Sequence, residues 1–132
     1  MKTLKVRSIV EGNPSGRILF SSKPIAFLKG VDPDRGQVVE PKHPIFKKSF
    51  AGKILVFPNS VGSSVGAYVI YRMKKAGHAP KAIINQSADI ITASGCAIAG
   101  IPLFDLPEGG MEELSSAKVV RFNRKKSEIR IS

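Results

Sequence analysis

Alternating apolar and polar positions divide this chain into short strands, one clear helix and a strand-forming C-terminal end. A continuous apolar run at Lys53–Phe57 predicts a buried strand. Turns rich in glycine, proline and aspartate punctuate the region before it. In that region the pattern predicts four strands, at Leu4–Val10, Gly16–Phe20, Ile25–Phe27 and Gln37–Val39.

The clearest helical pattern runs from Ser63 to Ala76. Val65, Val69 and Met73 recur every four residues, which predicts one apolar face. Later segments predict a strand at Ala82–Ile84, a short helix or turn at Asp89–Ser94, an apolar strand at Ala97–Phe104, a short helix at Glu108–Leu114 and a hairpin of Lys118–Phe122 with Ser127–Ile131.

This order of elements predicts an α/β fold, because strands come first, then a central strand, loop and helix, then further strands. The chain has 132 residues, of which 42% are hydrophobic, enough for one core. We therefore expect a single compact β/β/α domain over residues 1–132, with helices packed on a barrel-like sheet. No apolar run reaches the length of a membrane span, so we expect no membrane partner and a cytoplasmic location.

Cysteine and histidine content limits the possible metal chemistry. Cys96 is the only cysteine, which excludes an internal disulfide and an iron–sulfur cluster held by this chain alone. Its small, apolar neighbours predict a buried structural thiol. His43 is expected in a loop and His78 at a helix end, and neither has partners at metal-ligand spacing. We expect no metal site in this chain.

The net charge of +11 leaves several kinds of partner open. A basic RNA-binding or ribosome-associated module is one alternative. The distribution argues against a dedicated nucleic-acid stripe, because basic residues are sparse between Leu55 and Phe104 and few tyrosines accompany them. An acidic partner subunit or an anionic substrate would suit the same charge.

The best candidate for chemistry is the small-residue loop that opens the Ser63–Ala76 helix. Ser63 and Ser64 place two hydroxyls at a helix N-terminus, where partial positive charge favours an anion. A simpler interpretation is that one serine only caps the helix. Asn59, Ser60 and Gly62 already supply capping and turn capacity, however, so a second adjacent serine is surplus to helix initiation.

A second candidate is the turn from Gly30 to Gly36, where Pro33 would hold Asp32 and Arg35 in fixed positions. A purely structural turn explains the same residues. No Gly-x-Ser-x-Gly elbow or phosphate-binding loop is present, which weakens a hydrolase or NTPase interpretation.

Four segments together resemble a known family. They are Gly30-Val31-Asp32-Pro33 with Gly36, the helix-opening Gly62-Ser63-Ser64, Ala79-Pro80-Lys81-Ala82-Ile83-Ile84 and Ala99-Gly100-Ile101-Pro102-Leu103. Their order and spacing resemble the small-subunit, or swivel-domain, part of the aconitase X group, nearest to its archaeal phosphomevalonate dehydratase branch. The resemblance implies a swivelling β/β/α domain that docks on a large subunit as a heterodimer. It also implies a [4Fe-4S] cluster held by that large subunit and not by this chain.

The implied reaction is dehydration of (R)-5-phosphomevalonate, a small phosphorylated hydroxy acid, to trans-anhydromevalonate 5-phosphate in a modified mevalonate route to isoprenoids. The chain alone would be inactive. In aconitases the swivel domain supplies a Gly-Ser-Ser-Arg loop whose first serine is the base. By position, Ser63 is the implied base and Ser64 a substrate contact, with Gly62 and Asn59 of the same loop beside them. Val65 replaces the arginine, so Arg35 becomes the candidate cation on this chain.

Other interpretations stay open from the sequence. Another aconitase X reaction, such as dehydration of a hydroxyproline, would use the same loop, although the basic charge favours a phosphorylated substrate. A basic RNA-binding module would show salt-sensitive affinity that does not depend on Ser63. A structural docking protein would use the serines only to start a helix.

Overall fold

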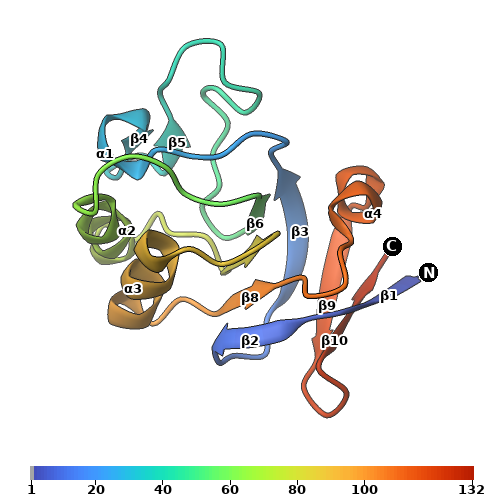
Figure 1. Cartoon of the computed structure of the whole chain (residues 1–132). Helices are drawn as coiled ribbons and strands as arrows, with labels where there is room; N and C mark the ends of the chain where they lie inside the picture. The colour runs from blue at the N-terminus through green and yellow to red at the C-terminus, as the bar shows by residue number, and fades with distance from the viewer. Residues whose placement is uncertain (1) are drawn as a thin grey trace.

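One mixed sheet of eight strands organises the molecule (Figure 1). The computed structural model describes residues 2–132, so Met1 of the expected domain lies outside the described residues. The strands are β1 (Lys2–Lys5), β2 (Arg7–Val10), β3 (Ser15–Phe20), β6 (Ile54–Phe57), β7 (Ala82–Asn85), β8 (Leu103–Asp105), β9 (Val119–Asn123) and β10 (Glu128–Ile131). Their order in space is β1-β10-β9-β3-β6-β7-β8-β2.

The middle of the sheet is parallel and its flanks are antiparallel. β3, β6, β7 and β8 run parallel to one another, and the pairs β6–β7 and β7–β8 are each joined through a helix. The helices are α1 (Phe27–Gly30), α2 (Gly66–Lys75), α3 (Ile90–Ala99) and α4 (Met111–Ser116). α2 and α3 lie side by side on one side of the sheet, and α4 lies near β9 on the other side (Figure 1). A small hairpin of β4 (Val31–Asp32) and β5 (Gln37–Val38) stands apart from the main sheet.

Two apolar cores meet at the parallel strands. Leu55 and Phe57 of β6 face the core under α2 and α3, whereas Ile54 and Val56 face the inside of the curved sheet. All four side chains are fully buried, which explains why this strand reads as a continuous apolar run. Gly95 allows α3 to approach α2 closely, because a Cβ there would lie 2.7 Å from the Ile70 Cδ1 atom.

The predicted α/β fold is confirmed, with a nearly closed, barrel-like sheet and packed helices in one compact domain. The predicted C-terminal hairpin is confirmed as β9 and β10. The predicted long strand at Leu4–Val10 is instead two strands. Val6 interrupts it with an inward-facing side chain, β1 pairs with β10 and β2 pairs with β8, so the two halves form opposite edges of the sheet.

The prediction for residues 89–104 was wrong about where the helix ends. A single helix, α3, continues to Ala99, and the strand is only Leu103–Asp105. The apolar run resembled a strand because this helix is almost wholly apolar. Gly100 is its left-handed C-cap, with φ of 72°, and not an interruption of a strand.

Three smaller predictions also change. The predicted strand at Ile25–Phe27 is reduced to a single bridge between Ile25 and Ser60, and α1 follows at once. The long helix begins at Gly66, three residues after Ser63, and Val65 is 47% exposed although its spacing placed it on the apolar face. The predicted helix at Glu108–Leu114 lies at Met111–Ser116. Among residues 2–132, no helix is long and apolar enough to cross a membrane.

Candidate functional site

The serine loop, residues 58–65, leaves the sheet at the carboxyl end of β6. That edge is where ligands commonly bind in open α/β sheets. The loop starts from a fixed point because Ile25 pairs with the backbone on both sides of Ser60. The Ile25 N–H donates to the Asn59 carbonyl at 3.2 Å, and the Val61 N–H donates to the Ile25 carbonyl at 3.0 Å. The Asn59 side chain is used locally, donating from Nδ2 to the Ser60 carbonyl at 2.9 Å.

Gly62 turns the loop outward and the two serines then precede the helix. Gly62 has φ of +91°, a value that side-chain-bearing residues rarely adopt. The Ser63 Oγ atom accepts a hydrogen bond from the Val65 N–H at 3.2 Å, and the Ser63 carbonyl accepts from the Gly66 N–H at 2.9 Å. Both Ser63 and Ser64 are exposed. Their hydroxyls are therefore accessible to a molecule that approaches from outside.

The hydrogen bond from the Val65 N–H to the Ser63 Oγ atom is consistent with two interpretations of Ser63. As a structural contact, it satisfies the backbone amide of Val65, the residue just before α2. The same contact would stabilise a negative charge on the Ser63 oxygen, because an amide donates most strongly to an anion. A helix N-terminus adds at most about 2 kcal/mol in favourable geometry. A serine base needs more than this, so further donors or cations would have to come from outside the loop.

Close packing beneath the loop fixes where α2 begins. A Cβ atom on Gly66 would lie 3.2 Å from Ile91 Cγ2 and 3.3 Å from the Phe27 Cβ atom. The Phe27 ring in turn packs edge-on against Phe57, with ring centroids 5.8 Å apart. The start of α2 is thus held between α1 and the first turn of α3.

A polar cluster behind the loop, in which Ser60 and Thr92 are buried and Asp89 is half-buried, was not predicted from the sequence. The Asp89 carboxylate accepts hydrogen bonds from the Ser60 N–H at 2.7 Å and from the Thr92 hydroxyl at 2.8 Å. It also accepts from the Thr92 N–H at 3.0 Å, which makes Asp89 the N-cap of α3. The Ser60 and Thr92 hydroxyls bond to each other. An aspartate three residues before a threonine indicates a helix cap, but nothing in that spacing indicates a link to Ser60.

Arg35 is placed apart from the serine loop. Its neighbour Asp34 pairs with Arg72 at 3.0 Å, and a Cβ on Gly36 would lie 2.5 Å from the His78 carbonyl oxygen. Both contacts are to the C-terminal half of α2 or just beyond it. Gly66 and Arg72 are six residues apart, which is about 9 Å along a helix axis, and Ser63 lies beyond Gly66. The structure therefore does not bring Arg35 and Ser63 together within this chain.

Lys29 is a cation closer to the serine loop, and the sequence prediction missed it. It follows Leu28, whose backbone N is 3.7 Å from the place of a Cβ on Gly66. Lys29 is exposed and has φ of 72°, an uncommon value for a residue with a side chain. No local sequence signal distinguishes it from the other lysines of this basic chain.

The remaining candidates have structural surroundings. His43 is buried, with Nδ1 accepting from the Ile45 N–H at 3.3 Å and Nε2 lying 3.0 Å from the Pro24 carbonyl, so it ties its loop to the body. Cys96 is fully buried, as predicted, and burial followed by the Asp89 charge raises its pKa to about 12. Across residues 2–132, no cluster of His, Cys, Asp and Glu side chains could hold a metal ion.

Exposed apolar side chains flank the serines. Val61 is 45% exposed, Val65 is 47% exposed, and Ile90 at the start of the neighbouring α3 is 79% exposed. Such side chains at the rim of a polar loop are typical of a surface that another protein covers. The loop thus has the properties of one half of a site: accessible hydroxyls, directed amides and an apolar rim.

Comparisons with known proteins agree with this geometry. Residues 3–131 match the family described as the aconitase X swivel domain. The chain is 50% identical to the phosphomevalonate dehydratase small subunit of Methanosarcina acetivorans, over 91% of this chain and 84% of that protein. It is 44% identical to the protein of the same name from Thermococcus gammatolerans, over 97% of this chain and 96% of that one.

Two solved structures share the fold over nearly their whole length. The crystal structure of Thermococcus kodakaraensis aconitase X in its holo-form has a TM-score of 0.88 at 43% identity, covering 100% of this chain and 99% of that one. A solution NMR structure of a UPF0107 protein has a TM-score of 0.84 at 36% identity, covering 99% of each chain. The chain belongs to the aconitase X swivel domain family.

Proposed function

We propose that this chain is the small subunit of a phosphomevalonate dehydratase in a mevalonate pathway. Relatives that cover most of the chain carry that name. The observation that carries the proposal is the exposed Ser63 hydroxyl, which accepts from the Val65 N–H at the start of α2. An oxygen placed in this way is prepared to carry negative charge toward a ligand that approaches from outside.

Ser63 acts as the general base. As an alkoxide, its Oγ atom takes the proton from the carbon next to the substrate carboxylate. The C–H electron pair becomes the new double bond and the hydroxyl on the neighbouring carbon leaves. With the proton that Ser63 later releases, the net small product is water. The Val65 N–H and the partial positive charge of the α2 N-terminus lower the cost of the alkoxide, and the partner surface supplies the remaining stabilisation.

The other loop residues bind and orient the substrate. Ser64 offers a second exposed hydroxyl, and Gly62 leaves room for a carboxylate to approach the backbone. Asn59 lies at the foot of the loop. Arg35, predicted as a substrate contact, belongs to a turn near the other end of α2 and lies 3.7 Å from the Asp32 carboxylate, so Lys29 is the better-placed cation of this chain. We expect Lys29→Ala to raise KM for the anionic substrate more than Arg35→Ala does.

The large subunit completes the site and carries the [4Fe-4S] cluster. This chain does not fit such a cluster, because its single thiol is buried in α3 and holds its proton up to about pH 12. The apolar rim of Val61, Val65 and Ile90 is the surface that the large subunit covers. Without that partner the chain is inactive. We also expect a cytoplasmic location and no nucleic-acid or membrane partner.

Reconstitution tests the proposal. The chain is combined anaerobically with its cluster-bearing large subunit, and turnover is measured with (R)-5-phosphomevalonate and with a hydroxyproline as separate substrates. We expect trans-anhydromevalonate 5-phosphate from the pair and no product from either subunit alone. Turnover of the hydroxyproline alone would assign the chain to another aconitase X reaction. Failure to bind the partner, together with salt-sensitive RNA binding, would contradict the proposal.

A further inference from the structure

We propose that Asp89 is a positioning residue for the serine loop: its carboxylate fixes the point from which the loop reaches Ser63. The proposal rests on the proposed function, since it assigns a second residue to the same site. Asp89 does not touch the substrate. It acts through the backbone of Ser60, three residues before the base.

The two oxygens of the Asp89 carboxylate accept hydrogen bonds from different parts of the chain, one from α3 alone and the other also from the serine loop. Oδ2 accepts from the Thr92 N–H at 3.0 Å, which is the ordinary capping contact of α3. Oδ1 accepts from the Ser60 N–H at 2.7 Å, a residue 29 positions earlier in the chain, and from the Thr92 hydroxyl at 2.8 Å. A helix cap needs only the first contact. The other oxygen binds the serine loop.

Burial makes the contact with Ser60 strong and costly to lose. Ser60 is 6% exposed and Thr92 is fully buried, so little water competes for their polar groups. The Asp89 carboxylate is itself half-buried, and a charged acceptor forms a stronger hydrogen bond than a neutral one. Without Oδ1, the Ser60 N–H would lose its acceptor in a place that water reaches poorly. The loop would move to satisfy that group.

A displacement of the Ser60 backbone would also displace Ser63, because few residues separate the two. The backbone around Ser60 is already paired with Ile25 on one side, and Asp89 holds it on the other. Only Val61 and Gly62 separate Ser60 from Ser63, and Gly62 adopts a left-handed conformation without a side chain to stabilise it. Displacement of a catalytic group by about 1 Å can cost about 100-fold in rate. The Asp89 contact therefore controls the rate through geometry.

Substitution by serine separates the two tasks of Asp89. Serine is also a strong N-cap, so Asp89→Ser keeps a cap on α3, but its short side chain cannot also reach the Ser60 N–H. Asp89→Asn has one acceptor oxygen for the two N–H donors, and its NH2 group faces the other donor. We expect Ser63 to be held in place less and less well along the series Asp, Asn, Ser at position 89. Glu112→Ser removes an exposed carboxylate from the first turn of α4 and is the control for loss of charge at a helix start.

Two readouts are measured on each variant. Amide hydrogen exchange of the full chain is expected to show at least tenfold faster exchange at Ser60 in Asp89→Ser, while the Thr92 amide stays protected. In the reconstituted pair, kcat is expected to fall at least tenfold, with KM changed less than threefold and subunit assembly retained. Asp89→Asn should lie between the native protein and Asp89→Ser, and Glu112→Ser should match the native protein in both readouts.

Ser63→Ala, measured in parallel, distinguishes the two proposals. Full activity of Ser63→Ala would refute serine-base catalysis, whereas the exchange data would still decide whether Asp89 holds the loop. If Ser63→Ala is inactive but Asp89→Ser keeps native kcat, or if the Ser60 amide stays protected in it, the positioning role is overturned. If Asp89→Ser does not fold, Asp89→Asn decides: a reduced kcat at unchanged KM supports the role and a native kcat contradicts it.

Discussion

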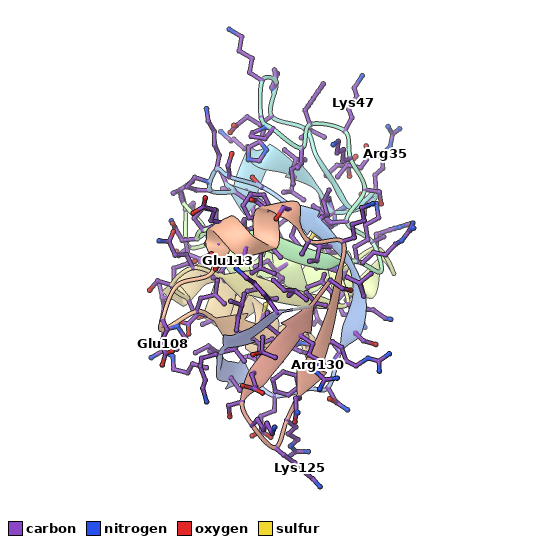
Figure 2. The ribbon with its side chains drawn as sticks, turned by 90° about the vertical axis from the view of Figure 1, so that its right-hand side faces the viewer. Arg35, Lys47, Glu108, Glu113, Lys125 and Arg130 are labelled. Carbon is purple, nitrogen blue, oxygen red and sulfur yellow. The ribbon has the colours of Figure 1, made fainter. Side chains whose placement is uncertain are left out.

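Two ends of the molecule are held together by different kinds of interaction. The serine loop and its support at α3 depend on a few polar contacts between distant parts of the chain, such as Asp89 with Ser60. The basic ribbon formed by β1, β9 and β10 depends on a repeating pattern, with Ile129 buried inside and Arg130 exposed outside. Figure 2 shows this ribbon, with Lys125 at the tip of its hairpin. The comparison indicates that stability resides mainly in the ribbon and the cores, whereas the geometry of the candidate site depends on the polar contacts of the loop.

The ribbon also has an electrostatic cost that the loop lacks. Arg121 and Arg130 are directly opposite each other on neighbouring strands, on the exposed face. Like charges in this arrangement destabilise a strand pair. The apolar side beneath them offsets that cost, for example through the Phe104 and Phe122 rings, whose centroids are 4.5 Å apart. Apolar packing thus stabilises the ribbon, whereas repulsion between its opposed arginines destabilises it.

The largest stability effect is expected from the inner side of the ribbon. Ile129→Ala removes a side chain that is 1% exposed and leaves a cavity in the core inside the curved sheet. We expect the free energy of unfolding to fall by about 2–5 kcal/mol. Urea unfolding of the chain measures this. Because the loop is remote, kcat of the folded, reconstituted pair should be unchanged, and a loss of kcat would break the division between the two ends.

The opposite result is expected at the loop end. Gly66→Val places a branched side chain at a position where even a Cβ atom alone would lie 3.2 Å from Ile91 Cγ2. We expect stability to fall by about 1–3 kcal/mol from overpacking. The kcat of the folded pair should fall as well, by about 100-fold, because the start of α2 shifts with the serines. Kinetics of the folded, assembled pair and urea unfolding are both measured, and a native kcat in the assembled pair would contradict this expectation.

Relief of the charge repulsion in the ribbon is expected to stabilise the chain slightly. Arg121→Thr replaces one of the two opposed guanidinium groups with a residue that favours strands. We expect the free energy of unfolding to rise by about 0.2–1 kcal/mol at low salt, with the gain shrinking as salt screens the native pair. Urea unfolding at about 20 mM salt and at about 500 mM salt measures the difference. A loss of stability at low salt would show that Arg121 contributes more through packing than it costs through charge.

The effect that is smallest at neutral pH is the one at Cys96, because it develops only at alkaline pH. Burial, with a smaller contribution from the Asp89 charge, raises the pKa of this thiol from 9.0 to about 12. Above pH 9 the unfolded thiol loses its proton while the folded thiol keeps it, so the thiol destabilises the native state increasingly up to about pH 12. The stability advantage of the native chain over Cys96→Ala should therefore shrink by up to about 1.4 kcal/mol per pH unit above pH 9. A constant difference between pH 8 and pH 10 would contradict the raised pKa.

The sequence predicts those parts of the molecule that follow a local period. The buried strand β6 and the C-terminal hairpin were predicted because their burial patterns are visible in the residues themselves. The end of α3 was not, because an apolar run that packs against α2 has the same composition as a buried strand. Leu4–Val10 was not predicted to divide, since a sheet that nearly closes on itself is a property of the whole chain.

The candidate site, like the fold, could be predicted from the sequence only where the signal is local. Small residues between a strand and a helix predict the serine loop. The contact between Asp89 and Ser60 spans 29 positions and has no local signature. Arg35 was chosen as the candidate cation because Val65 replaces the arginine of the aconitase loop, but the turn that carries Arg35 packs near the far end of α2. Spacing along the chain thus predicts the candidate loop, and only the fold identifies what surrounds it.

The central claim is that Ser63 is the base of a site completed by a partner. Its most direct test is the rate of (R)-5-phosphomevalonate dehydration by the reconstituted pair with Ser63→Ala, beside Ser64→Ala and the native chain. We predict that Ser63→Ala assembles normally and loses about 100- to 10,000-fold in kcat, with a smaller loss for Ser64→Ala. Native kcat in an assembled Ser63→Ala pair would show that Ser63 only caps the helix.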